Sequence, residues 1–408
     1  MLSNLLGGRM LGKKHPKEVV MDPTTRPATA NPQQYQGPTD ALPVGRGKLS
    51  REEDNAAWAE TVLPWHYRGD PLAEVVASRL REQGGAMARP ALTIRQWADQ
   101  GDADCQQLLA DMEAVPQWVD YTLMRRGGAM AQRHFPHLIL ALTYGGLPLT
   151  FAHPDAAAIF VGTGRMEANI TRRLNESASL FFGVCDSDAL APGQAMWEVC
   201  LHVRLVHALV RMKCLQQGWD LAHRGMPVSQ LATAAGPAFF GTQMLDGMRR
   251  LGARISDEEA AGHCMIWRYT TRLLGVPEVL LGKTQQEQDR FDVPMLSQFF
   301  APDDTAKTIM ATLLDGLCAQ RPTSRIPRSL QIALFRCMLG EEMADAYGVP
   351  LSRVGDRALS MLRPALSGYS RAQRVPGVST GLRRLGQGIL ERLGTEGVVS
   401  PAAAGTAH

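Results

Sequence analysis

The sequence predicts an all-α protein built as a single large multi-helix bundle. Apolar residues recur three and four positions apart in long segments, which is the period of a helix with a buried side. Glycine and proline separate these segments, and no stretch shows the apolar–polar alternation of a half-buried strand. Hydrophobic residues make up 45% of the chain, which is enough for a large core. We expect roughly fourteen helices from this pattern.

The helices follow one another along most of the chain. Helical spacing is seen over residues 71–81, 93–112, 128–146, 154–160, 166–184, 195–215, 241–252, 305–319, 327–340 and 378–394. A further helix is expected between the capping residue Ser256 and the stop signal Gly275, and Pro136 is expected to kink the helix over 128–146.

Composition changes divide the chain into three parts. Residues 1–48 are rich in proline, glutamine, threonine and glycine, which predicts a disordered arm. Residues 49–365 are expected to form the helical domain. Residues 366–408 are expected to hold an amphipathic helix and a flexible tail.

Charge and cysteine content exclude several classes of function. The formal net charge of +3 is spread along the chain, so nothing indicates a nucleic-acid partner. Seven cysteines lie far apart with no CxxC pair, which is typical of reduced thiols and not of zinc or iron–sulfur sites. The first residues lack the continuous apolar stretch of a signal peptide, and no segment has the length of a spanning helix. We therefore expect a cytoplasmic protein.

The most informative segment is the apolar helix over 195–215. On a helical wheel His207 shares a face with Val203, and Arg204 and Arg211 flank His207 one turn away on either side. A helix this apolar is expected to be buried, and buried guanidinium groups need an anionic partner. Haem would satisfy all three side chains, because iron binds an imidazole and the two propionates pair with arginines. The alternatives are a core histidine, and arginines that pair with carboxylates or reach solvent at the helix ends.

A second group of polar residues lies on the helix over 166–184. Arg173, Glu176, Ser177 and Leu180 occupy positions i, i+3, i+4 and i+7 and so form one stripe. On its own this pattern is also that of an exposed Arg–Glu pair. His263 is expected to be a core or capping histidine and not a ligand.

Familiar nucleotide and haem-attachment motifs are missing from the sequence. Gly162-Thr163-Gly164 has no third glycine and no preceding strand, so it does not predict a dinucleotide site. The upstream glycine that a P-loop would need before Gly282-Lys283-Thr284 is replaced by Pro277. There is no CxxCH segment, so a haem would be bound non-covalently, as haem b.

Several short motifs, taken together in order and spacing over about residues 55–350, resemble one family. They are Val115-Pro116-x-Trp118-Val119-Asp120 with Arg126-Gly127, Thr163-Gly164-Arg165, Arg172-Arg173-Leu174-x-Glu176-Ser177, Arg204-Leu205-x-His207-x-x-Val210-Arg211, Leu245-Asp246-x-Met248-Arg249-Arg250-Leu251-Gly252, Trp267-Arg268 with Leu274-Gly275-Val276-Pro277-Glu278, and Ala344-Asp345-x-x-Gly348-Val349-Pro350. The pattern is similar to that of the MpaB-type oxygenases, formerly a domain of unknown function, which include the bacterial latex clearing proteins.

The resemblance implies an all-helical haem-b protein that activates dioxygen, with a bundle that encloses the haem and is globin-like in character. In the rubber-cleaving members the histidine of RxxHxxxR binds the iron, and its counterpart here is His207. Arg204 and Arg211 would then pair with propionates or orient His207. The resemblance places Arg173, Glu176 and Ser177 on the oxygen-binding side, as catalytic residues. The implied reaction uses O2 to oxidise or cleave a C=C bond of an apolar, isoprenoid or lipid-like substrate.

Two positions depart from the rubber-cleaving relatives. Glu176 stands where they have lysine, and Met212 stands where they resemble a second histidine. A carboxylate donates to bound oxygen only when protonated, whereas an ionised carboxylate could abstract an allylic proton. Polyisoprene is therefore not the expected substrate.

Two other functions remain open at the level of the sequence. One is a non-catalytic haem carrier or gas sensor, which Glu176 in place of lysine would suit. The other is a helical interaction protein without a cofactor. In that case the amphipathic segment Val378–Gly394, which has apolar residues on one side and arginines on the other, would contact a membrane surface or pack back on the body.

Overall fold

The computed structural model describes residues 61–83, 89–162, 178–319, 322–373, 375 and 377–396. Within these ranges the chain forms helices and no strand, so the predicted all-α class is confirmed. The arm predicted over 1–48 and the stripe containing Arg173, Glu176 and Ser177 lie outside the described residues.

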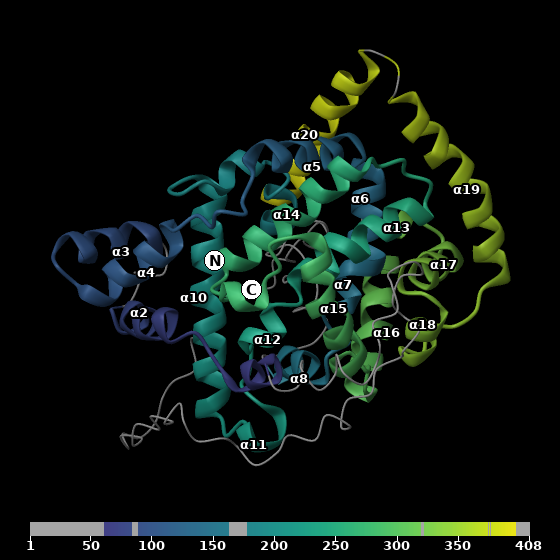
Figure 1. The fold of residues 1–408 in the computed structure, drawn as a ribbon. Coiled ribbons are helices and arrows are strands. Elements are labelled where there is room, and N and C mark those ends of the chain that lie inside the picture. The colour runs from purple at the N-terminus through teal and green to yellow at the C-terminus, as the bar shows by residue number, and fades with distance from the viewer. Residues whose placement is uncertain are drawn as a thin grey trace, which may run out of the picture.

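The first described helices form a lobe against one side of the molecule (Figure 1). They are α2 (Pro71–Glu82), α3 (Pro90–Asp99) and α4 (Ala103–Glu113). The single helix expected over 93–112 is thus two helices. Gly101 adopts a φ of 95° between them, a conformation that favours glycine, and the side chain of Asp102 then caps α4 by accepting from the Cys105 amide.

Helix α10 (Ala195–Gln216) is the long helix that runs beside this lobe in Figure 1. Its bounds agree with the predicted 195–215, and the chain leaves the helix at Gly218, which has a φ of 84°. The helix packs on α2, α3 and α14 (Asp257–Leu273). Trp197, which is fully buried, fixes its start by donating to the carbonyl oxygen of Met112.

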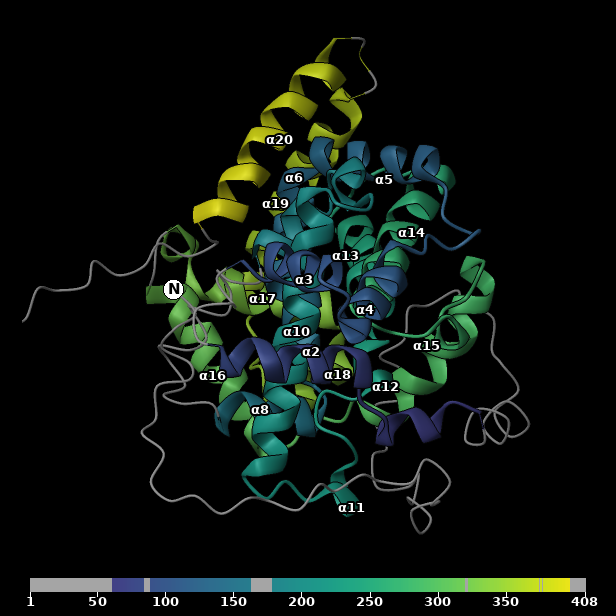
Figure 2. The same cartoon turned by 90° about the vertical axis from the view of Figure 1, so that its left-hand side faces the viewer.

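The centre of the bundle is the pair α5 (Tyr121–Arg133) and α14, which lie side by side in both views (Figures 1 and 2). Glycines make this close approach possible, because a Cβ atom on Gly127 or Gly262 would collide with the backbone of the facing helix. Helix α14 begins as predicted, with a capping box between Ser256 and Glu259, and stops before Gly275.

Two π-helical turns pack against each other near this pair. They are η5 (Leu142–Gly146) and η7 (Pro237–Gln243). The helix expected over 128–146 breaks at His134, just before Pro136, and continues through η5 instead of ending at its glycines. Gly145 and Gly146 are buried there against methionine and phenylalanine side chains, so they serve packing and do not stop the helix.

The second half of the chain completes the bundle. Helices α17 and α19 pack together, α19 lies along the outer margin in Figure 1, and α20 returns to α5. The remaining helical elements of the described residues are η3 (Leu63–Tyr67), α6 (Phe135–Ala141), α7 (Leu147–Leu149), α8 (Pro154–Gly162), η6 (Ser187–Leu190), α11 (Leu221–Arg224), α12 (Gln230–Thr233), α13 (Met244–Arg250), η8 (Glu278–Leu280), α15 (Gln285–Phe299), α16 (Asp304–Ala319), η9 (Thr323–Arg325), α17 (Arg328–Leu339), α18 (Glu341–Ala346), α19 (Arg353–Ala372) and α20 (Val378–Glu396).

Three further sequence expectations can be compared with these elements. The suggested boundary between residues 365 and 366 falls inside the continuous helix α19. All seven cysteines are free thiols. In the described ranges no single helix has the length and apolar composition to cross a membrane, although the bent pair Phe135–Leu149 and Pro154–Gly162, at 94° to each other, meets both criteria together.

Candidate functional site

Helix α10 brings the predicted residues Arg204, His207 and Arg211 to neighbouring sides of one rigid element. The two arginines are 3% and 2% exposed and face the body of the protein. His207 lies about 50° round the helix from them, on a side that is only half-buried. The sequence expected all three residues on one face of the helix, whereas the structure buries the two arginines and leaves His207 half-buried on the neighbouring side.

Arg204 is held by two carboxylates of the chain itself. Its Nε lies 2.6 Å from Asp70 Oδ2 and its Nη2 lies 3.1 Å from Asp70 Oδ1, which is a two-pronged ion pair. Its Nη1 lies 2.6 Å from Asp111 Oδ2. Arg272 of α14 also binds Asp111, with Nη2 2.7 Å from Oδ1. The ion pairs thus join α2, α4, α10 and α14 in one buried network.

Arg211, about two turns further along α10, is also fully engaged by the protein. Its Nη1 lies 2.6 Å from Glu74 Oε1, and its Nη2 and Nε donate to the carbonyl oxygens of Val228 and Pro227 at 2.6 and 3.2 Å. Glu74 Oε1 also accepts from the Asp70 amide at 3.0 Å, which links this pair to the Arg204 network.

Two glycines leave the space that this network needs. A Cβ atom on Gly275 would fall against Asp70 and Arg204, and one on Gly69 would fall against Glu74 and Arg211. Gly275 also has a φ of 93°, which ordinary residues adopt at a cost.

The charge on Asp111 is maintained although the residue is largely buried. Burial is the largest single effect and favours the neutral acid, but the Arg272 hydrogen bond and the charge of Arg204 outweigh it, and the pKa of Asp111 is lowered. In this structure the carboxylates that pair with Arg204 and Arg211 belong to the protein itself. Each guanidinium nitrogen of the two arginines already donates to a protein oxygen atom.

The side of α10 that carries His207 has a different character. Val203, Val206 and Val210 surround His207 on the helix, and all four side chains are half-buried. Within the described part of the chain, these valines are not among the residues of the main hydrophobic core or those packed against it. We call these four residues the His207 face. An imidazole amid apolar side chains fits the needs of a haem, whose macrocycle is apolar and whose iron binds a neutral imidazole.

Two other buried histidines, His263 and His134, form hydrogen bonds within the protein. His263 is buried, and its Nε2 donates to the Phe240 carbonyl oxygen at 2.8 Å, as expected of a core histidine. His134 uses Nδ1 with the Met130 carbonyl and Nε2 with the Ser370 hydroxyl. In the described ranges no group of three or more histidine, cysteine or acidic side chains is arranged to bind a metal ion.

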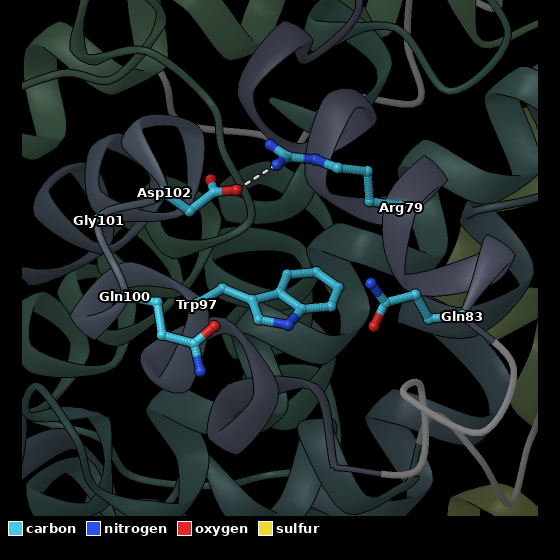
Figure 3. A pocket seen from close by; sticks show the side chains of 6 residues that line it. All are labelled: Arg79, Gln83, Trp97, Gln100, Gly101 and Asp102. Atoms are coloured by element: carbon cyan, nitrogen blue, oxygen red, sulfur yellow. Dashed lines mark hydrogen bonds and ion pairs between the residues drawn. The ribbon is translucent and has the colours of Figure 1, made fainter.

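A surface pocket of about 440 Å³ in the α2–α4 lobe is a different feature (Figure 3). Trp97, Gln83, Gln100 and Asp102 line it, and Arg79 pairs with Asp102 at its edge. It holds no histidine and none of the residues predicted for the site, so it does not compete with the His207 face as a haem site.

Known proteins share sequence and fold with this chain. The model of the family "ER-bound oxygenase mpaB/B'/Rubber oxygenase, catalytic domain" matches residues 132–371, more than half of the chain. The chain belongs to this oxygenase family. The resemblance seen in the sequence motifs is thereby confirmed.

Two individual relatives support the family assignment. A rubber oxygenase from Streptomyces sp. (strain K30) is 24% identical over 318 residues, which is 75% of each chain. The structure of latex clearing protein LCP in its closed state has a TM-score of 0.61 to this chain at 21% identity, covering 80% of this chain and 91% of that one. At this identity the structural match establishes a shared helical fold.

The sequence did not identify the acidic partners of the arginines. Asp70 and Asp111 lie 134 and 93 residues away from Arg204 along the chain. A weak signal existed in the Asp70 and Glu74 pair, since both stand at the start of a helix and four residues apart on one side of it. The requirement for carboxylates was predictable, but which carboxylates met it was not.

Proposed function

We propose that this protein is a haem-b-dependent oxygenase that uses O2 to oxidise or cleave a C=C bond of an apolar, isoprenoid or lipid-like substrate. The observation that carries the proposal is the His207 face, a half-buried imidazole set among three half-buried valines on a helix whose opposite side is buried in the core. Membership of the oxygenase family supports the reaction class.

The residues of α10 have separate roles in this proposal. His207 would bind the haem iron through its imidazole, and Val203, Val206 and Val210 would contact the macrocycle and exclude water from it. Arg204 and Arg211 would act as positioning residues, because their ion pairs fix the rotation of α10 and with it the direction of His207. The haem, when bound, would supply the redox chemistry that activates dioxygen.

Arg173, Glu176 and Ser177 complete the proposal from the sequence resemblance. We assign them to the oxygen-binding side, where Arg173 and Ser177 would donate hydrogen bonds. The Glu176 carboxylate, when ionised, would accept a proton from an allylic carbon of the substrate.

The substrate class rests on the relatives. The Streptomyces relative is named for rubber, a hydrocarbon polymer with C=C bonds in its repeat. Cleavage of one such bond by one O2 yields two carbonyl groups, and both oxygen atoms are then found in the products. We propose an apolar alkene as substrate without requiring that it be the polymer.

The test combines haem reconstitution with isotope labelling. The full chain is loaded with haemin and reduced, its Soret band and pyridine haemochrome are recorded, and a polyprenyl alkene is added under ¹⁸O2. We expect a haem-b spectrum and carbonyl products with ¹⁸O at both new oxygen positions. Haem binding without alkene oxidation in a single turnover would instead make the protein a carrier or gas sensor, and a protein that stays colourless after haem addition would overturn the cofactor assignment.

A further inference from the structure

The outward side of helix α19 is an exposed apolar stripe. Helix α19 packs on α17 on its inner side, where Leu359 is buried, and it lies at the margin of the molecule in Figure 1. On the outer side Val354 and Met361, two turns apart, are 69% and 78% exposed, and Leu351 just before the helix is 79% exposed. Single exposed apolar residues are common, but a line of them on one side of a helix indicates a binding surface.

The stripe continues to the turn that joins α19 to α20. Small exposed residues follow Met361 along the same side, and Val375 and Val378 are 52% and 38% exposed at the turn. In both views the ends of the two helices at this turn project beyond the body of the molecule, and in Figure 1 α19 lies along its outer margin (Figures 1 and 2).

Positive charges border this stripe. Arg353, Arg357 and Arg371 are exposed on α19, and no carboxylate in the described part of the chain lies within ion-pair distance of any of them. Asp356, the acidic residue of the helix, projects from a different side, about 140° round the helix from Met361. By contrast Arg336 on the neighbouring α17 is paired with Asp345 at 2.7 Å. The outward side of α19 is therefore apolar, and the arginines that border it have no carboxylate partner among the described residues.

We propose that the outward side of α19 docks on an anionic lipid surface. Exposed apolar side chains would enter the boundary between headgroups and acyl chains, and the flanking arginines would pair with lipid phosphates, which is how a basic amphipathic helix binds a membrane surface. A lipid phase also collects apolar molecules, so docking would bring the protein to a substrate of the proposed class. The docking itself does not depend on the haem.

The sequence suggested a membrane contact through the helix that is α20 in the structure, whereas the proposed contact is made by α19. In α20 (Val378–Glu396) Leu390 is 2% exposed and packs with the core, and Arg383 donates to the Gln132 side chain. The helix lies on α5 with a glycine, Gly386, against the backbone at Gln132. On α20, Leu390 and Leu393 pack against the body although Leu385 is 54% exposed, whereas α19 packs through Leu359 and leaves Val354 and Met361 outside.

The test is flotation of the full chain with vesicles of phosphatidylcholine alone or with added phosphatidylglycerol. We compare the wild type with Arg357→Gln/Met361→Ser, and with the control Arg89→Gln/Leu92→Ser, which alters an exposed arginine and an exposed leucine on α3. Binding is expected on anionic vesicles only and should weaken as salt is raised. The loss of one arginine reduces partitioning about fivefold, and loss of Met361 adds to this, so the α19 variant should bind at least tenfold less tightly while the control is unchanged.

Several results would overturn the proposal. One is equal binding of the two double variants, and another is equal binding to neutral and anionic vesicles. A third is a wild-type dimer, measured by light scattering, that Met361→Ser dissociates, since the stripe would then be an interface between copies of this chain. Thermal melting of each variant shows that it is folded. His207→Ala protein should still bind vesicles, so failure of the haem proposal and failure of the docking proposal give different results.

Discussion

The arginine side and the His207 face of helix α10 differ in how deeply their side chains are buried. Arg204 and Arg211 are buried, and every one of their contacts described above is supplied by carboxylates or carbonyls of the protein. The valines around His207 stay half-buried and outside the main core. The same helix is thus a fixed structural element on one side and carries a half-buried imidazole among half-buried valines on the other. We infer that the arginine side provides stability and the His207 face provides function.

The largest expected effect is on the arginine side. Replacing Arg204 with Met would leave the buried Asp70 without its counter-charge and Asp111 with Arg272 alone. Removing one partner of a buried ion pair costs about 3–5 kcal/mol of unfolding free energy. His207→Ala, measured without haem, should cost less than about 1 kcal/mol because the side chain is only half-buried. Chemical denaturation of both variants measures the two values. Equal losses would remove the distinction between the two sides.

The next largest effect on the free energy of unfolding is expected from the buried Leu205, compared with its half-buried neighbour Val206. Leu205 is completely buried, and Leu205→Ala should cost about 2–5 kcal/mol through lost burial and a cavity. Val206, the next residue, is half-buried on the His207 face, and Val206→Ala should cost about 1 kcal/mol or less. The same denaturation experiment applies. If Val206→Ala proved as costly as Leu205→Ala, the valines would be part of the protein core after all.

An effect of similar size to that of Val206→Ala is expected when each of several buried histidines responds to acid. Burial lowers the pKa of five histidines below the usual 6.5, to about 4 for four of them and to about 3 for the fifth. These are His66, His134, His137, His263 and His153. Between pH 6.5 and 4 the unfolded chain therefore binds protons that the folded chain does not, and stability falls as pH falls. Each group should cost about 1 kcal/mol between pH 7.5 and 5.5.

One buried acid partly opposes this trend. Burial raises the pKa of Asp155 to about 7, so its contribution to stability is present at low pH and is lost as pH rises through 7. Melting temperatures from pH 7.5 to 5.5 measure the sum. His137→Phe should reduce the slope relative to the wild type, because it removes one of the buried histidines. Identical slopes for the wild type and His137→Phe would contradict the burial argument.

Local signals in the sequence predicted much of the fold. The bounds of α10, the capping box at Ser256 and the stop at Gly275 follow from residues within one or two turns of each boundary. Helix α19 was missed because Pro364 stands inside it, where proline normally ends a helix. The break at Gly101 was missed because helical spacing continues on both sides of it.

The site was predictable to the extent that it is local. His207, Arg204 and Arg211 lie within eight residues of one another, so helical geometry alone fixed their arrangement. The partners of the arginines come from α2 and α4 through tertiary packing, and the half-burial of the valines also depends on that packing. No periodicity in a single sequence contains this information.

The most direct test of the central claim uses two histidines on the same helix. His202 and His207 are both half-buried on α10, one to two turns apart, so His202→Ala is a matched control for His207→Ala. Each variant and the wild type are titrated with haemin and followed at the Soret band. We predict that the wild type and His202→Ala bind haem stoichiometrically and that His207→Ala loses the ligand-dependent Soret band while keeping its melting temperature. A His207→Ala protein that still binds one haem with an unchanged spectrum would contradict the assignment of His207 as the iron ligand.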